Sequence, residues 1–172
     1  MQQNLFYFAY GSNLLFARLH ARCPSIVNVG TAILSGHKLS FDKPGGDGSG
    51  KCGIEKTGVD GYVIGVLYEM DAMEKPVLDK IEGLGHGYEH KDVTVEIDNR
   101  PVDAFTYYPT RLDCALPPYD WYKNFVLQGA RENNFPASYI QTIESVTSVM
   151  DSNADRRQEN FDIAGTLLFS GG

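Results

Sequence analysis

The stretch from Leu5 to Leu14, LFYFAYGSNL, decides the fold because it joins a buried strand to a helix through a tight turn. Its aromatic-rich first part, residues 5–10, predicts a strand buried on both faces. Gly11 can adopt a positive φ angle, and Ser12 or Asn13 can cap a short helix over residues 14–21. Such a turn presents backbone N–H groups that suit a carboxylate or a developing oxyanion, although a glycine turn before a helix is also common as plain architecture.

The pattern on the C-terminal side of this stretch predicts strands that mostly follow one another without an intervening helix. We expect β-structure over residues 27–41, with a break near Ser35-Gly36, and strands over residues 62–68, 88–97 and 102–108. Helices are expected from an Asp71 cap to a Gly83 stop, over residues 119–132 and over residues 136–150. The fold class is therefore α/β in the α+β sense, with a mixed, mostly antiparallel sheet curled into a small barrel and flanked by helices.

The chain length and the change of composition near residue 150 predict one domain with a short extension. A chain of 172 residues fits a single domain, which we expect over residues 1–150. Residues 151–160 are polar and predict a linker, and residues 161–169 form a short apolar tail within the extension 151–172. That tail either closes the sheet or docks on a second subunit, so a homodimer stays open.

Charge and cysteine usage exclude several classes of partner and site. The net charge of −7 argues against nucleic acid, which selects basic surfaces. The N-terminal residues lack a basic region and a long apolar run, so we expect neither a signal peptide nor a membrane partner. The three cysteines are odd in number and widely spaced, which favours reduced thiols in the cytoplasm.

Two motif matches are interpreted as false. Residues 45–52 approach a phosphate-binding loop, but the following GIEKTGVDG predicts no helix to direct its amides at a phosphate. His86, Glu89 and His90 match the HxxEH pattern of zinc proteases, which requires a helix. The residues from Tyr88 onward alternate as a strand, and residues four apart in a strand lie about 13 Å apart, too far to share one zinc ion. We expect no metal site.

Several stretches together resemble the γ-glutamylcyclotransferase family over about residues 5–146. The matching segments are YFAYGSNL at 7–14, LDKIEG at 78–83, Gly87-Tyr88, FTYY at 105–108 and YKNFVLQGARENNFPASY at 122–139. The YGSN turn is shared with a wider superfamily that includes γ-glutamylamine cyclotransferases and plant AIG2-like proteins. The last segment resembles the glutathione-cycle branch more specifically.

The resemblance implies an intramolecular reaction and a set of site residues. In this family the α-amine of a γ-glutamyl amino acid attacks its own γ-carbonyl, giving 5-oxoproline and a free amino acid without a cofactor. Glu82 matches the catalytic acid/base, at the end of a helix whose dipole disfavours an ionised carboxylate. The implied substrate-binding residues are Tyr7, Phe8, Ala9, Tyr10, Gly11, Ser12, Asn13, Tyr88, Tyr107 and Tyr122.

Two departures and two other readings accompany this expectation. One residue is missing between Glu82 and Tyr88 relative to the family pattern, and Glu55 and Lys56 stand where the family is usually apolar, which is expected to alter a pocket wall. The chain could instead be a γ-glutamylamine cyclotransferase acting on γ-glutamyl-ε-lysine. It could also be a catalytically silent binding module on the same scaffold.

Overall fold

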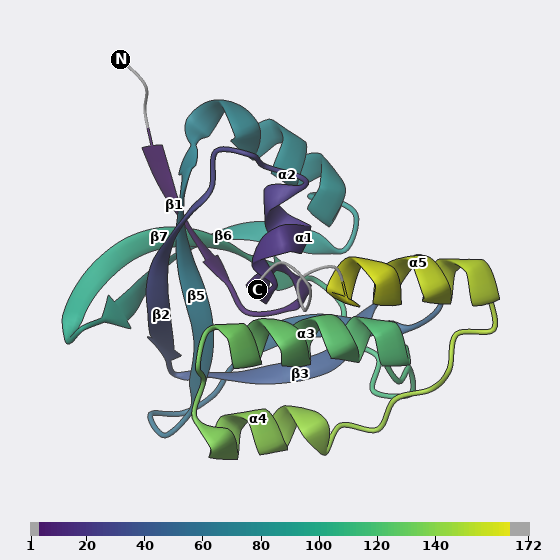
Figure 1. Ribbon diagram of the computed structural model, residues 1–172. Helices are drawn as coiled ribbons and strands as arrows, with labels where there is room; N and C mark the ends of the chain where they lie inside the picture. The colour runs from purple at the N-terminus through teal and green to yellow at the C-terminus, as the bar shows by residue number, and fades with distance from the viewer. Residues whose placement is uncertain (1–3, 166–172) are drawn as a thin grey trace.

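The computed structural model describes residues 4–165, and a closed five-stranded barrel lies at its centre (Figure 1). Its strands, in order around the barrel, are β1 (Asn4–Ala9), β5 (Tyr62–Asp71), β2 (Val27–Ser35), β6 (Tyr88–Ile97) and β7 (Arg100–Pro109). Neighbouring strands are antiparallel except β1 and β7, which meet in parallel where Tyr7 lies opposite Phe105. The predicted mixed, mostly antiparallel barrel is confirmed.

A separate hairpin of β3 (His37–Pro44) and β4 (Gly50–Lys56) leans on the barrel. The break near Gly36 separates β2 from β3 as predicted, and Gly36 adopts a φ of 71° there. The glycine-rich residues 45–49 form the hairpin turn, and the chain continues through Lys51 as strand β4, where a phosphate-binding loop would need a helix. Residues 45–52 therefore resemble a phosphate-binding loop in sequence but not in structure.

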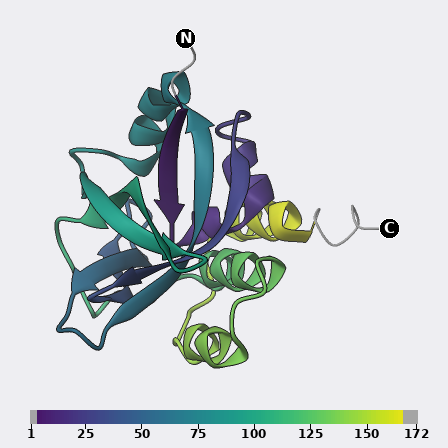
Figure 2. The same cartoon turned by 90° about the vertical axis from the view of Figure 1, so that its left-hand side faces the viewer.

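Helices cover one end and one side of the barrel (Figures 1 and 2). The short helices η1 (Ser12–Leu14) and α1 (Phe16–His20) follow β1, and η2 (Ala72–Glu74) leads into α2 (Lys75–Glu82) at one end. Asp71 caps η2 by accepting from the Met73 backbone N–H at 2.9 Å, and Gly83 ends α2 with a φ of 72°, as expected. The remaining helices are α3 (Asp120–Glu132), α4 (Ala137–Glu144) and α5 (Ala154–Gly165).

The helix expected over residues 136–150 was predicted too long, because α4 ends at Glu144. Lys123 Nζ donates to the backbone carbonyls of Glu144 and Val146, at 2.6 Å each. Val149 then forms a parallel bridge with Tyr119. These contacts with the start of α3 hold residues 145–150 in a non-helical path.

The polar residues after Met150 are not a bare linker, since most of them belong to α5. Asp151 is buried, accepts from Trp121 Nε1 at 2.8 Å and pairs with the Arg156 guanidinium at 2.6 and 2.7 Å. Asn153 accepts from the Arg156 backbone N–H at 3.0 Å, in the first turn of the helix. Residues 166–169 of the expected tail lie outside the described residues, and the domain boundary at residue 150 stays a prediction.

The barrel core is built from aromatic and aliphatic side chains, but β1 is buried on both faces only in its second half. Tyr7, Phe8 and Ala9 are buried, whereas Leu5 and Phe6 are partly exposed, which corrects the expectation for this strand.

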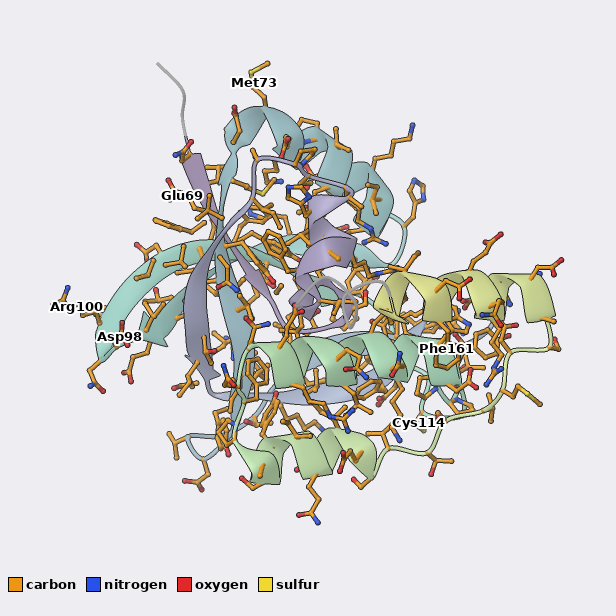
Figure 3. All side chains as sticks on the ribbon, in the orientation of Figure 1. Glu69, Met73, Asp98, Arg100, Cys114 and Phe161 are labelled. Atoms are coloured by element: carbon orange, nitrogen blue, oxygen red, sulfur yellow. The ribbon has the colours of Figure 1, made fainter. Side chains whose placement is uncertain are left out.

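The labelled side chains of Glu69, Met73, Asp98, Arg100 and Cys114 lie at the periphery (Figure 3). Cys23, Cys52 and Cys114 are all free thiols. Across residues 4–165, no helix has the length and apolar character needed to span a membrane.

Candidate active site

A small cavity forms where the end of β1, the end of α2 and the start of β6 meet. Its volume is about 30 Å³, so a ligand larger than a water molecule or two must extend beyond it. We call it the inner cavity, and its lining residues are Tyr7, Tyr10, Gly11, Ser12, Asn13, Cys52, Glu82, Tyr88, Tyr107 and Tyr122. Segments from both halves of the chain, far apart in sequence, thus contribute to one site.

Glu82 provides the carboxylate of the inner cavity. It is the last residue of α2, and the left-handed Gly83 turns the chain away behind it. Its Oε1 accepts from Asn13 Nδ2 at 2.8 Å and from Arg22 Nη1 at 3.2 Å. Because both contacts involve Oε1, Oε2 is the oxygen available to a proton on a ligand. The Arg22 guanidinium makes this a charge-assisted contact that holds the carboxylate in place.

Asn13 links Glu82 to the tyrosines. Its amide Nδ2 also donates to the Tyr7 hydroxyl at 3.1 Å, and its Oδ1 accepts from Arg22 Nη1 at 3.0 Å. The expectation that Ser12 or Asn13 caps a helix through its side chain was wrong, since neither η1 nor α1 has a side-chain cap. Asn13 fixes the carboxylate instead of the helix end.

Gly11 serves the site through its missing side chain and not through the positive φ angle expected from the sequence. Its φ is −114°, so the expected positive φ is not found. A Cβ at this position would lie 2.9 Å from Cys52 Cβ and 3.4 Å from the Tyr122 hydroxyl oxygen. Only glycine therefore lets the turn approach β4 and α3 this closely.

The predicted tyrosines line the inner cavity and are held by hydrogen bonds. Tyr10 donates to the Tyr107 carbonyl at 2.6 Å, and Tyr88 donates to the Cys52 carbonyl at 2.5 Å. Tyr107 donates to Asp79 Oδ1 on α2 at 2.6 Å. Burial raises the pKa of all these phenols, and of Tyr7 and Tyr122, far above neutrality. The wall is accordingly uncharged and hydrogen-bonding.

Cys52 also lines the inner cavity, although no sequence motif marks it as a site residue. Its backbone N–H donates to the Tyr122 hydroxyl at 2.9 Å, while its carbonyl holds Tyr88. Burial raises the pKa of its thiol to about 12, so the thiol stays protonated and is a poor nucleophile. Its place under Gly11 comes from the hairpin packing, which no local pattern indicates.

Four expected contributors do not reach the inner cavity. Phe8 and Ala9 are fully buried and neither lines the inner cavity; strand alternation places Phe8 on the opposite face of β1 from the lining residue Tyr7. Glu55 pairs with Lys38 at 3.5 Å on the β3–β4 hairpin, and neither it nor Lys56 lines the site. The expected change of a pocket wall by these two charged residues is not found.

A wider cleft of about 210 Å³ adjoins the inner cavity, and we call it the outer cleft. Ser12, Glu82, Tyr88 and Tyr122 belong to the lining of both hollows. The other lining residues of the outer cleft are Arg18, Arg22, Lys43, Gly45, Gly46, Asp47, Lys51, Ile81 and Trp121. A ligand held at Glu82 can therefore extend from the inner cavity into the outer cleft.

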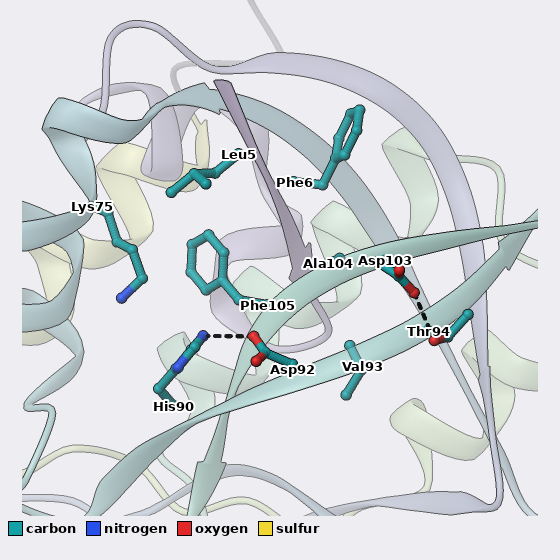
Figure 4. A pocket seen from close by; sticks show the side chains of 10 residues that line it. All are labelled: Leu5, Phe6, Lys75, His90, Asp92, Val93, Thr94, Asp103, Ala104 and Phe105. Carbon is teal, nitrogen blue, oxygen red and sulfur yellow. Dashed lines mark hydrogen bonds and ion pairs between the residues drawn. The ribbon is translucent and has the colours of Figure 1, made fainter. Parts of the chain in front are cut away.

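A separate groove of about 640 Å³ lies beside β1, β6 and β7 (Figure 4). It contains the His90–Asp92 pair, with Nε2 and Oδ1 3.2 Å apart, and apolar side chains such as Phe105. Residues 88–97 form β6 rather than a helix, as predicted against the zinc-protease pattern. Within residues 4–165, no group of three or more histidine, cysteine or acidic side chains is arranged to hold a metal ion. The groove shares no residue with the inner cavity.

Comparison of the sequence and the structure with known proteins identifies the family of the chain. A family model described as the AIG2-like family matches residues 62–143. A Bos taurus protein named gamma-glutamylcyclotransferase is 35% identical over 151 residues, covering 84% of this chain and 79% of that protein. A Homo sapiens protein of the same name is 32% identical, covering 84% and 80%. A solved structure of a gamma-glutamyl cyclotransferase superposes with a TM-score of 0.86 at 28% identity, over 95% of this chain and 99% of the other. With this shared sequence and fold, the chain belongs to the γ-glutamylcyclotransferase family of enzymes.

Proposed function

We propose that this protein converts a γ-glutamyl amino acid into 5-oxoproline and a free amino acid, with Glu82 as the general acid/base. The observation that carries the proposal is the position of the Glu82 carboxylate, which faces both the inner cavity and the outer cleft and is fixed by Asn13 and Arg22. The names of the bovine and human relatives support the same reaction class.

The reaction begins with proton transfer. Ionised Glu82 takes a proton from the substrate α-ammonium, and the freed amine attacks the γ-carbonyl carbon to form the ring C–N bond. The tetrahedral intermediate carries an oxyanion. When it collapses, the original amide C–N bond breaks and Glu82 returns its proton to the departing nitrogen. Glu82 then carries the second proton from the ring nitrogen to the freed amine, which gives a neutral lactam and an amino acid with its ammonium group. Because nucleophile and electrophile belong to one molecule, the chemistry needs positioning and proton transfer but no added cofactor.

The turn after β1 supplies donors for the substrate's charged oxygens. The first N–H groups of η1 have no acceptor within that helix, and Gly11 and Ser12 line the inner cavity. These groups would bind the α-carboxylate of the γ-glutamyl part or the oxyanion. Neutral phenols, with Tyr7 bonded to Asn13, complete the wall.

The proposed setting is a reducing compartment such as the cytoplasm, with a small-molecule substrate. The three free cysteines are compatible with reduced thiols, and two of them are buried. Both γ-glutamyl amino acids and γ-glutamylamines satisfy the chemistry at Glu82, so the leaving group has to be tested directly.

The test is to incubate the purified protein with γ-glutamyl-alanine and, separately, with γ-glutamyl-ε-lysine, and to quantify 5-oxoproline. We expect product from γ-glutamyl-alanine, and we expect Glu82→Gln to lower kcat by about 10²- to 10⁴-fold, the usual contribution of a general acid/base. Glu159→Gln makes the same charge change at an exposed position of α5 and should retain full activity. Full activity of Glu82→Gln would contradict the assignment, and so would absence of product from both substrates.

A further inference from the structure

The charged side chains of the outer cleft do not balance. Four of them are cationic and two are carboxylates, which leaves an excess of two positive charges: Arg18, Arg22, Lys43, Lys51, Asp47 and Glu82. Arg22 pairs with Glu82 at 3.2 Å, and Lys51 pairs with Asp47 at 2.7 Å. Of the four cations in the outer cleft, Arg18 and Lys43 are the two that form no ion pair with a carboxylate within residues 4–165.

Arg18 is held against an aromatic ring instead of an acid. Its guanidinium carbon lies 4.3 Å from the ring centre of Phe125, and its Nε is buried without a hydrogen-bond partner among the described residues. Burial, together with the nearby Arg22, lowers the pKa of Arg18 to about 10. A buried donor of this kind is costly to leave unpaired, so it points to an acceptor that arrives with a ligand.

Lys43 occupies the junction between the two hollows. It is only 9% exposed, and its Nζ lies 4.4 Å from the ring centre of Tyr88, a residue that lines both the inner cavity and the outer cleft. Gly87 leaves room for this ammonium, since a Cβ there would lie 3.0 Å from Nζ. The cation–π contact holds the charge in place while its hydrogen-bond donors stay available to an anion.

The proposed substrate carries a carboxylate that suits this position. With the γ-glutamyl part at Glu82 and the Gly11–Ser12 turn, the leaving amine must project into the adjoining outer cleft. An α-amino acid places a carboxylate directly beside the leaving nitrogen. The ε-amine of lysine places its carboxylate at the far end of an aliphatic chain, next to an ammonium that the excess positive charge would repel.

From these observations we propose that Arg18 and Lys43 form an anion subsite for the α-carboxylate of the leaving amino acid, which favours γ-glutamyl α-amino acids over substrates whose leaving group has no carboxylate beside the leaving nitrogen. This inference rests on the proposed function and specifies its substrate class. It assigns Lys43 and Arg18 a role in specificity, separate from the proton transfer at Glu82.

The test compares γ-glutamyl-alanine with γ-glutamyl-alaninamide, which lacks only the negative charge on the leaving group. We expect the wild-type protein to prefer the carboxylate by about 10- to 100-fold in kcat/KM, the range for one charge-assisted contact. Lys43→Met should lose most of this preference by raising KM for the carboxylate substrate. Turnover of the amide, which offers this subsite no carboxylate, should fall far less than turnover of the carboxylate substrate, and measurable amide turnover shows that the variant is folded.

Matched variants separate the subsite from a general charge effect. Lys38→Met makes the same change on the same strand, at a side chain that is 57% exposed, and should keep the wild-type preference. Arg18→Met should reduce the preference in the same direction as Lys43→Met. Equal kcat/KM of the wild-type protein for both substrates would overturn the subsite and leave the proposed function standing. Failure to form 5-oxoproline from either substrate would overturn the proposed function and the subsite with it.

Discussion

At the scale of single residues, the site depends on the close approach of the Gly11 turn to Cys52. Gly11 has an ordinary φ of −114°, yet a Cβ there would lie 2.9 Å from Cys52 Cβ. The YGSN sequence therefore predicts that a glycine is needed, but the reason lies in β4, which packs beneath the turn from elsewhere in the chain. A local sequence pattern cannot predict this contact, because it forms only when segments far apart in the sequence pack together.

Gly11→Ala should consequently disturb both the turn and the wall residue beneath it. We expect a loss of stability of about 1–3 kcal/mol from overpacking and a fall in kcat/KM of about 100-fold from misplacement of the turn. Gly58→Ala is the matched control, since a Cβ there meets no heavy atom within 4 Å and the backbone φ is not positive. Thermal unfolding and 5-oxoproline formation measure the two effects, and wild-type values for Gly11→Ala in both would contradict this explanation.

At the scale of elements, the sequence predicted most strands and the ends of α2, but not the partners of the helix end. Asp71 and Gly83 are local signals, and both serve as expected. Arg22 lies 60 residues from Glu82 in the sequence and reaches it only because the segment after α1 lies beside the end of α2. Glu82 was thus identified by resemblance to a motif, while Arg22, Lys43 and Cys52 required the fold.

The end of α2 also gives a prediction about how Glu82 is positioned. Gly83 adopts the left-handed conformation, and the nearest heavy atom to a Cβ there would be 4.0 Å away, so Gly83→Ala carries a conformational cost rather than a clash. We expect it to destabilise the protein by about 1 kcal/mol and to lower Tm by about 2–4 °C. Gly83→Asn should cost less, because asparagine tolerates this conformation better. Equal Tm values for both variants and the wild type would show that the helix end does not depend on glycine.

At the scale of the whole molecule, net charge is a poor guide to the site. The chain carries a net charge of −7, yet the charged side chains of the outer cleft are cationic in excess. The same limitation applies to residues 151–160, whose polarity suggested a linker. Their charged side chains instead form ion pairs: Arg156 pairs with Asp151 at 2.6 Å, and Arg157 pairs with Asp120 of α3 at 2.7 Å. These pairs attach α5 to α3. Composition reports how many charges there are, whereas function and folding depend on which of them meet.

Asp151 gives this attachment a pH dependence with a definite sign. Its hydrogen bonds from Arg156, Asn153 and Trp121 lower the pKa of its carboxyl below the usual value in the folded state. A lowered folded-state pKa means that the stabilisation is fully present above the unfolded value of about 4 and is lost as the pH falls below it. Asp151→Asn should therefore lower Tm at pH 7 by on the order of 5 °C, and the difference from wild type should shrink as the pH falls below about 4. Asp155→Asn, at an exposed position in the first turn of α5, removes the same charge and should change Tm much less than Asp151→Asn does at pH 7. Calorimetry of the three proteins over this range decides the matter, because a Tm difference that does not vary with pH would mean that the Asp151 charge does not hold α5 in place.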